Sequence, residues 1–469
     1  MKELLIKTSF AALFMLAAFN ATAQNGMPSK ENVMNLKSAY VDKIDEVKIE
    51  KNGVTDYGMQ SSLHKDQSAT LQRAIKELSE SGGGKLFIPK GTYLFRSVRM
   101  MSNVHIIFEE GTILKPYWGD ESNVNMFDFS NDDKMSNIPI ENCSIRASKG
   151  FYTVDYSNIP RNQEIRTRFV ILKMVNNFSI ADADIKDNYS VYCAFTLTPA
   201  DAPNSLSWKV DRPTNGELTH CKIYNPNPGY GLVQIHGARN VYFEDIYSKG
   251  GVTLRLETGA NTPTIGVYDI FARNVRNEDG RNAIMMNPHV AQNGTVKADG
   301  VWTKNSNVAV KAEGGPAGGK HGANSAAGRF GNDSKIINVH SIYGENSVAS
   351  TKNLMNYHKE QYDLIKYLDV VPYGKWINSP SVAACIDETG DYWDITFENV
   401  TTEGFKYDNC DIIVREEGKG NGTEKNDQSM AIRESIPHLK KWHGYTKDDF
   451  FTPKKPVAAD EVLKPQFKN

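Results

Sequence analysis

The sequence has little cysteine, almost no net charge and, after its first residues, no hydrophobic segment long enough to cross a membrane. Five cysteines in 469 residues, none in a C-x-x-C pair, are too few and too scattered for a disulfide-stapled scaffold or a zinc site of that spacing. A net charge of -2 removes any composition-level argument for nucleic acid or an anionic membrane as the partner. Because no later stretch approaches the ~20 apolar residues of a spanning helix, we expect no membrane insertion.

The N-terminus has the form of a secretory signal peptide. A charged start, M-K-E-L-L-I-K, is followed by an apolar run from Phe10 to Leu16 and by a small-residue A-T-A that ends at Ala23. This apolar run is too short for a membrane span. We therefore predict that residues 1–23 are removed by cleavage near Ala23, and that the mature chain is secreted to the periplasm or the exterior.

A short apolar motif recurs along the chain: one apolar residue, a second two positions later and a third five positions after the first. Leu218, Val241, Ile270 and Val296 begin four successive copies, which are 23, 29 and 26 residues apart. Periods in the twenties with short β-rich segments are typical of a solenoid. The L-x-x-L-x-L-x-x-N signature of leucine-rich repeats is missing, and a propeller needs blades of roughly forty residues. The repeats predict an all-β solenoid, a right-handed parallel β-helix.

The same period divides the chain into segments. Asp66–Leu78 is predicted to be an amphipathic helix that covers the first coil, because the naked end of a strand stack invites aggregation. A long interval after the central repeats, with a glycine-rich run and a predicted helix over Leu354–Leu368, indicates an inserted α/β lobe. The predicted divisions are a signal peptide at 1–23, an N-terminal extension at 24–65, the β-helix at 66–410 with its lobe at about 314–392, and a C-terminal extension at 411–469.

The stretch T-L-R-L-E-T-G, from Thr253 to Gly259, is the candidate functional site. Successive side chains of a strand point to opposite faces, so its two leucines face a core while Arg255 and Glu257 face outward side by side. Alone, such residues also fit an ordinary surface ion pair. Polar side chains on the neighbouring repeats favour a functional groove instead.

Three other repeats supply those polar side chains. G-L-V-Q-I-H-G sends Gln234 and His236 outward, M-M-N-P-H-V carries His289, and V-A-V-K-A-E-G-G sends Lys311 and Glu313 outward. Equivalent positions on adjacent coils lie about 4.8 Å apart. Each side chain alone also fits a structural role, since amide ladders are common in stacked strands. Counting back from the repeats predicts one ladder: Gln234, Glu257, His289 and Glu313.

The runs G-Y-G-L-V-Q, G-G-V-T-L-R-L-E-T and N-P-H-V-A-Q-N-G, in that order, resemble motifs of the iota-carrageenases, glycoside hydrolase family 82. The resemblance extends over most of the mature chain and is densest from Gly229 to Gly315. It implies a secreted β-helix enzyme that cleaves within a sulfated red-algal galactan by inverting hydrolysis, with iota-carrageenan as the expected substrate. The expected partner is thus an anionic sulfated polysaccharide, and we expect the protein to act as a monomer.

The resemblance also implies roles for individual residues. Glu257 matches the general acid, Gln234 and His289 match assisting polar residues, and Arg255 matches a basic residue that meets substrate sulfate. The family motif continues as E-T-D, with the aspartate as general base, whereas this chain has Gly259 at that position. Loss of a general base removes a contribution of roughly 10²- to 10⁴-fold.

Glu313 is our candidate for the missing base. It lies two coils from Glu257, about 9.6 Å by strand spacing, at the wide limit of the ~6.5–9.5 Å that separates an inverting pair. A base from the inserted lobe is equally open. Sulfate contacts are expected from arginine, whose planar fork pairs two oxygens at once. The substrate-binding candidates are Arg255, His236, Arg281 and Lys311.

Two other functions stay open on the sequence alone. A β-eliminating lyase on an anionic polysaccharide needs a basic residue such as Arg255 or Lys311, and a non-catalytic glycan-binding protein fits the missing aspartate. No redox or organic cofactor is required, and no metal ligand set is predicted. The resemblance permits a structural cation such as calcium or sodium, although no loop has a calcium-binding spacing.

Overall fold

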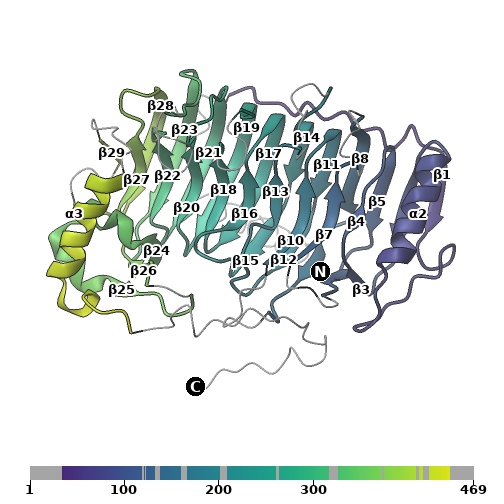
Figure 1. Cartoon of the computed structure of the whole chain (residues 1–469), viewed down its shortest axis with the longest axis horizontal. Helices are drawn as coiled ribbons and strands as arrows, with labels where there is room; N and C mark the ends of the chain where they lie inside the picture. Colours follow the sequence, from purple (N-terminus) through teal and green to yellow (C-terminus); the bar gives the residue numbers. More distant parts are fainter. Residues whose placement is uncertain are drawn as a thin grey trace, which may run out of the picture.

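The computed structural model describes residues 34–118, 121, 123–131, 138–159, 166–200, 209–259, 264–315, 326–371, 374–407, 411–415 and 422–443. Over these residues the chain winds into a right-handed parallel β-helix with a helix near each end (Figure 1). The predicted fold class is confirmed. The predicted signal peptide at 1–23 lies outside the described residues, and no helix within them is long and apolar enough to span a membrane.

Two long sheets form the walls of the β-helix in the described part of the chain. The first has ten strands in the order β29-β27-β22-β20-β18-β16-β13-β10-β7-β4; we call it the groove sheet. Its strands are β4 (Val98–Arg99), β7 (Asn123–Phe129), β10 (Arg166–Leu172), β13 (Phe195–Leu197), β16 (Gly231–Ile235), β18 (Val252–Glu257), β20 (Asn282–Asn287), β22 (Val308–Glu313), β27 (Ala383–Glu388) and β29 (Ile412–Val414).

The second sheet has sixteen strands and bends around the rest of each coil, because its later strands are long enough to continue through the bend. All pairings in both sheets are parallel, with neighbouring coils in register. Its strands are β1 (Ile49–Asn52), β2 (Gly84–Ile88), β3 (Thr92–Phe95), β5 (Val104–Phe108), β6 (Ile113–Pro116), β8 (Ile140–Ala147), β9 (Tyr152–Asp155), β11 (Val175–Ala181), β12 (Ala183–Lys186), β14 (Thr214–Thr219), β15 (Lys222–Tyr224), β17 (Ala238–Lys249), β19 (Val267–Glu278), β21 (Val296–Lys304), β23 (Ser334–Ile342) and β28 (Ile395–Glu403).

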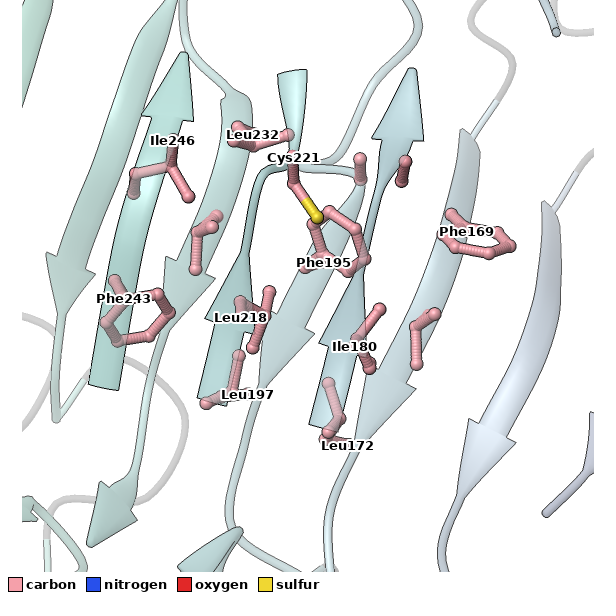
Figure 2. Packing of buried hydrophobic residues seen from close by; sticks show 14 of the residues in the cluster. Phe169, Leu172, Ile180, Phe195, Leu197, Leu218, Cys221, Leu232, Phe243 and Ile246 are labelled. Atoms are coloured by element: carbon pink, nitrogen blue, oxygen red, sulfur yellow. The ribbon is translucent and has the colours of Figure 1, made fainter. Parts of the chain in front are cut away.

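The core lies between the two sheets, where apolar side chains from facing strands stack coil upon coil (Figure 2). Phe95, Phe127, Phe169 and Phe195 form one such stack, with successive ring centroids 5.6, 5.5 and 5.7 Å apart. Edge-to-face aromatic pairs of this kind add stability beyond the area that they bury. The stack holds neighbouring coils at a fixed spacing, which positions the polar residues outside.

Asparagines near the start of several strands of the second sheet form a second stack. Asn142, Asn177 and Asn240 have positive φ angles of 54°, 59° and 56°, a conformation that asparagine tolerates better than most residues. The Asn177 side chain donates to Asn142 at 2.8 Å, and Asn240 donates to Asn215 at 2.8 Å. These amide contacts satisfy side-chain polar groups from one coil to the next and keep the coils in register.

The predicted N-terminal cap is present as helix α2 (Ser68–Glu80), whose buried side chains Leu71, Ile75 and Leu78 cover the first coil. The extension before it is not separate from the β-helix. Strand β1 pairs with β2, and the segment before β1 runs over the second sheet, where the Met34 N–H donates to Asp299 at 2.7 Å. The predicted boundary at residue 66 is therefore too late for the described residues.

The inserted lobe is smaller and less helical than predicted. Its described part is a three-stranded antiparallel sheet of β24 (Ser347–Ser350), β25 (Lys366–Tyr367) and β26 (Trp376–Ser379), with 3-10 helices η3 (Thr351–Asn356) and η4 (Lys359–Leu364). The predicted helix over Leu354–Leu368 is wrong, because two 3-10 turns and a short strand occupy that stretch. Residues 316–325 of the predicted lobe lie outside the described residues.

The C-terminal segment packs on this lobe. Strand β29 extends the groove sheet past the predicted boundary at residue 410. Helix α3 (Gly422–Ser435) and 3-10 helix η5 (Pro437–Leu439) follow, and Ile436 and Leu439 join the apolar cluster of the lobe. The predicted C-terminal extension beyond residue 443 lies outside the described residues. The four described cysteines, Cys143, Cys193, Cys221 and Cys385, are buried and unbridged.

Candidate active site

Glu257 is the last residue of β18, and the alternation of that strand directs it out of the core. Leu254 and Leu256 are fully buried inside the β-helix, so Arg255 and Glu257 lie together on the outer face of the groove sheet. Their side chains are 12% and 18% exposed, which is low for an ion pair on a sheet surface. Neighbouring side chains therefore surround this pair.

Both carboxylate oxygens of Glu257 are contacted. Gln234 on β16 donates to Oε2 at 2.7 Å, while an Arg255 guanidinium nitrogen lies 2.7 Å from Oε1. Nε2 of His289 lies 3.5 Å from the same Oε1. Of the predicted site residues, the structure thus brings Gln234, Arg255, Glu257 and His289 together.

The electrostatics of this cluster hold Glu257 in its ionised form. Burial alone would raise the pKa of Glu257, but the hydrogen bond from His289 and the positive charge of Arg255 outweigh it and lower the pKa to about 2. In the free protein Glu257 is therefore a carboxylate at neutral pH.

The cluster is real, but the predicted ladder has the wrong register. Gln234 is level with Arg255, and Glu257 is level with Asn287 rather than with Gln234. His289 is not on a strand: it follows β20 in a turn, with a φ of 45°. Side chains from different levels reach Glu257 because glutamine, arginine and histidine are long enough to cross one strand position.

A second carboxylate lies two strands further along the groove sheet. Asn287 is level with Glu257, and its side-chain nitrogen donates to Oε2 of Glu313 at 2.7 Å. The other oxygen of Glu313 contacts Lys311. Two strand spacings of about 4.8 Å separate Glu257 from Glu313, which gives about 9.6 Å between their backbone positions.

Lys311 does not occupy the position predicted for it. Its side chain is only 3% exposed and forms ion pairs with Glu313 and, at 3.4 Å, with Glu388 on β27. Burial would lower the pKa of Lys311, but the two carboxylates outweigh it and raise the pKa. Because its ammonium group is buried and already paired with two carboxylates, the structure gives Lys311 a role in holding Glu313 and Glu388, and its predicted contact with substrate stays a prediction.

His236 also differs from its predicted substrate-binding role. Its Nδ1 lies 2.8 Å from the backbone oxygen of Glu257, and since a carbonyl oxygen only accepts, this nitrogen carries the proton. Burial lowers the pKa of His236, which favours the neutral ring. The ring is 8% exposed and fixes the end of β18. His236 is a positioning residue for Glu257.

Gly259, where the sequence resemblance implies an aspartate in the family, has no room for a side chain. Its φ is +72°, in the left-handed region, and a Cβ atom would lie 2.8 Å from the backbone nitrogen of Ala291 and 3.1 Å from the backbone oxygen of Pro288. The turn that carries His289 therefore closes over this position. A base at residue 259 would require this turn to move.

Gly259→Ala is expected to destabilise the protein by about 2–5 kcal/mol, because left-handed strain and a backbone clash act together. Gly58 is the matched control, with a φ of +74° and nothing within 4 Å of a built Cβ. Gly58→Ala should cost only the strain, about 1–2 kcal/mol. Urea unfolding of both variants measures the difference. Equal losses would show that the contact with the turn is unimportant.

Two residues of the groove sheet, Asn287 and Arg168, escaped the sequence-based prediction. Asn287 lies on the strand between the two carboxylates and donates to Glu313, and its only sequence signal is its place beside the proline and histidine that follow it. Arg168 on β10 stacks on Tyr192, with its guanidinium carbon 3.5 Å from the ring centroid, and donates to Thr196. Within the described residues no group of three or more His, Cys, Asp or Glu side chains is arranged to hold a metal ion.

No family model matches the chain. Two curated proteins do: an iota-carrageenase of Zobellia galactanivorans, 36% identical over 270 residues, and an iota-carrageenase of Alteromonas macleodii, 33% identical over 268 residues. Over the aligned region, this chain is therefore similar to iota-carrageenases. The aligned region is 56% of this chain, and the chain spans about half, 52%, of the length of each of these iota-carrageenases.

Solved structures agree with this relationship. A 1,3-alpha-1,4-beta-D-galactose-4-sulfate-3,6-anhydro-D-galactose-2-sulfate 4 galactohydrolase superposes with a TM-score of 0.71 at 26% identity, over 82% of this chain and 94% of its own. An iota-carrageenase complexed to iota-carrageenan fragments has a TM-score of 0.72 at 24% identity, over 89% and 99% of the two chains. This chain therefore shares the fold of these solved structures over 82% and 89% of its length.

Proposed function

We propose that this protein is a glycoside hydrolase that cleaves within a sulfated galactan of the iota-carrageenan type, with inversion at the cleaved carbon. The observation that carries the proposal is the Glu257 carboxylate, held by Gln234, His289 and Arg255 in the groove of a fold shared with iota-carrageenases. A carboxyl group between an amide, an imidazole and a guanidinium suits proton transfer beside a negatively charged sugar.

In this proposal Glu257 is the general acid, and the substrate itself prepares it. A carboxyl group with a pKa of about 2 holds no proton at neutral pH. To act as an acid, Glu257 must therefore first lose part of its contact with the positively charged neighbours that lower this pKa. A sulfate ester beside Arg255 would compete with Glu257 for the guanidinium, which lies 2.7 Å from Oε1 in the free protein. Loss of that contact would raise the pKa of Glu257 and favour its protonated form.

Glu313 is the proposed general base. It lies beyond Asn287, about 9.6 Å from Glu257 by strand spacing, at the wide limit for an inverting pair with a water between them. Asn287 and Lys311 contact its two oxygens and fix its orientation. A base supplied by the lobe remains the alternative assignment.

A non-catalytic glycan-binding function is the second candidate, favoured by the closed turn around Gly259. A lyase has less support. Arg255 is paired with Glu257, and Lys311 is buried between two carboxylates that raise its pKa, so neither is a ready base. Secretion after a signal peptide, action as a monomer, and the absence of nucleic-acid or membrane partners belong to the same proposal.

Incubation of the mature protein with iota-carrageenan is expected to release new reducing ends without ultraviolet absorbance from unsaturated sugars. Agarose, which is an unsulfated galactan, and a uronate polymer serve as control substrates and should stay intact. Absorbance that rises together with reducing ends would indicate a lyase. Salt-sensitive binding of iota-carrageenan with no new ends would establish the binding protein in place of the hydrolase.

A further inference from the structure

We infer that Arg281, Lys375 and Trp376 form a binding site for a sulfate ester of the substrate, at the junction between the groove sheet and the lobe. Arg281 precedes β20 in the β-helix, whereas Lys375 and Trp376 belong to the lobe, at the start of β26. The site is therefore built from segments almost a hundred residues apart in the chain. The inference rests on the proposed function, since it names how the same groove recognises a sulfated sugar.

Trp376 is the fixed centre of this site. The Arg281 guanidinium carbon lies 5.1 Å from the centroid of its ring, and the Lys375 ammonium lies 5.0 Å from it. The ring is buried with Val348 and Val371 and packs so closely on Gly229 that a Cβ there would lie 3.1 Å from it. Because cations gain modestly from an aromatic face, the ring orients both without neutralising them.

The junction is continuous with the Glu257 cluster. Arg255 donates a hydrogen bond to the backbone oxygen of Gly229, the same glycine that Trp376 covers. The Arg255 guanidinium also lies 5.5 Å from the centroid of the Tyr230 ring. A sugar chain that reaches Glu257 along this side of the groove would thus pass Arg281 and Lys375.

Charge is unbalanced at this junction, and that imbalance points to an anion. Arg255 and Lys311 each have a carboxylate partner, whereas no described carboxylate lies within ion-pair distance of Arg281 or Lys375. The buried Nε of Arg281 also has no hydrogen-bond partner among the described residues. A half-buried cation without a counter-ion is costly, so it is expected to gain strongly from an anionic ligand.

The titration of these groups agrees with positive charges held close together. Burial, assisted by the charge of Arg255, lowers the pKa of Arg281 to about 10, and burial with the charge of Arg281 lowers the pKa of Lys375. With a pKa of about 10, Arg281 still carries its positive charge at neutral pH. A tetrahedral sulfate fits them, because the planar arginine fork contacts two of its oxygens and the ammonium contacts another.

The test measures binding separately from cleavage, in a Glu257→Gln background that keeps substrate intact. The probes are an iota-carrageenan hexasaccharide and its desulfated counterpart, titrated by calorimetry at low and at high salt. Arg281→Met is expected to weaken binding of the sulfated probe by roughly 10- to 100-fold, as for a hydrogen bond to a charged group. Lys375→Met, at an exposed position, should weaken it by about 3- to 10-fold. Both losses should shrink at high salt.

The controls remove the same charge elsewhere: Arg276→Met on β19 and Lys366→Met on β25, both at exposed positions, should bind as the parent does. Equal losses on the sulfated and desulfated probes would mean lost packing and would overturn the inference. Unchanged affinity in both site variants would overturn it while leaving the proposed function intact. If Arg281→Met fails to fold, Lys375→Met still decides. A parent that binds no sulfated probe would remove the proposed function as well.

Discussion

Glu257→Gln is expected to lower kcat on iota-carrageenan by at least about 10²- to 10⁴-fold, the contribution of a general acid. Glutamine keeps the shape and accepts hydrogen bonds through its amide oxygen, so the contact with Arg255 is retained in weaker form. It has no proton of suitable acidity to give to a leaving sugar oxygen. Reducing-end assays measure the loss, and calorimetry with an iota-carrageenan hexasaccharide should show affinity that is unchanged or increased.

Glu398→Gln is the matched control for this variant. Glu398 is also a strand carboxylate paired with a cation, Lys335, but it lies on β28 of the second sheet, outside the groove. It should retain the activity of the parent protein. Turnover of Glu257→Gln within a few-fold of the parent would remove Glu257 from the chemistry, and loss of hexasaccharide binding would mean a misfolded groove.

The sequence alone predicted the fold and the centre of the site for the same physical reason. Apolar alternation along strands determines which side chains face the core, so Leu254 and Leu256 implied that Arg255 and Glu257 face outward. Repetition of that alternation at a period in the twenties predicted the stacked coils. Convergence of Gln234 and His289 on Glu257 followed from stacking, although the levels were wrong.

Register, burial and the lobe could not be predicted in the same way. His289 lies in a turn, where no repeat fixes the position of a residue relative to neighbouring coils. The alternation of its strand predicted that Lys311 faces outward. Only the structure shows that its side chain is buried beside Glu388, which comes from a strand more than seventy residues later. Trp376 belongs to an antiparallel strand outside the repeat, so nothing in the period indicated that it packs beside Gly229.

Glu313, the proposed general base, is the most informative residue after Glu257. Glu313→Gln is expected to lower kcat by roughly 10²- to 10⁴-fold, because glutamine cannot take a proton from the attacking water. The Michaelis constant should change little, since the Glu313 oxygens are held by Asn287 and Lys311 and the proposed base acts on water rather than on a substrate group. The fold should persist, because Lys311 keeps its second carboxylate partner, Glu388.

Glu388→Gln is the matched control, because it removes the same charge from the same lysine one strand further away. Glu388 is level with Glu313 on the neighbouring strand β27, so it lies three strand spacings, about 14 Å, from Glu257. That distance is too long for an inverting pair with one bridging water. We therefore expect Glu388→Gln to retain turnover, and proton magnetic resonance of the parent's first products to show inverted anomers. Inactivity of Glu388→Gln with full activity of Glu313→Gln would contradict the assignment, and full activity of both would move the base to the lobe.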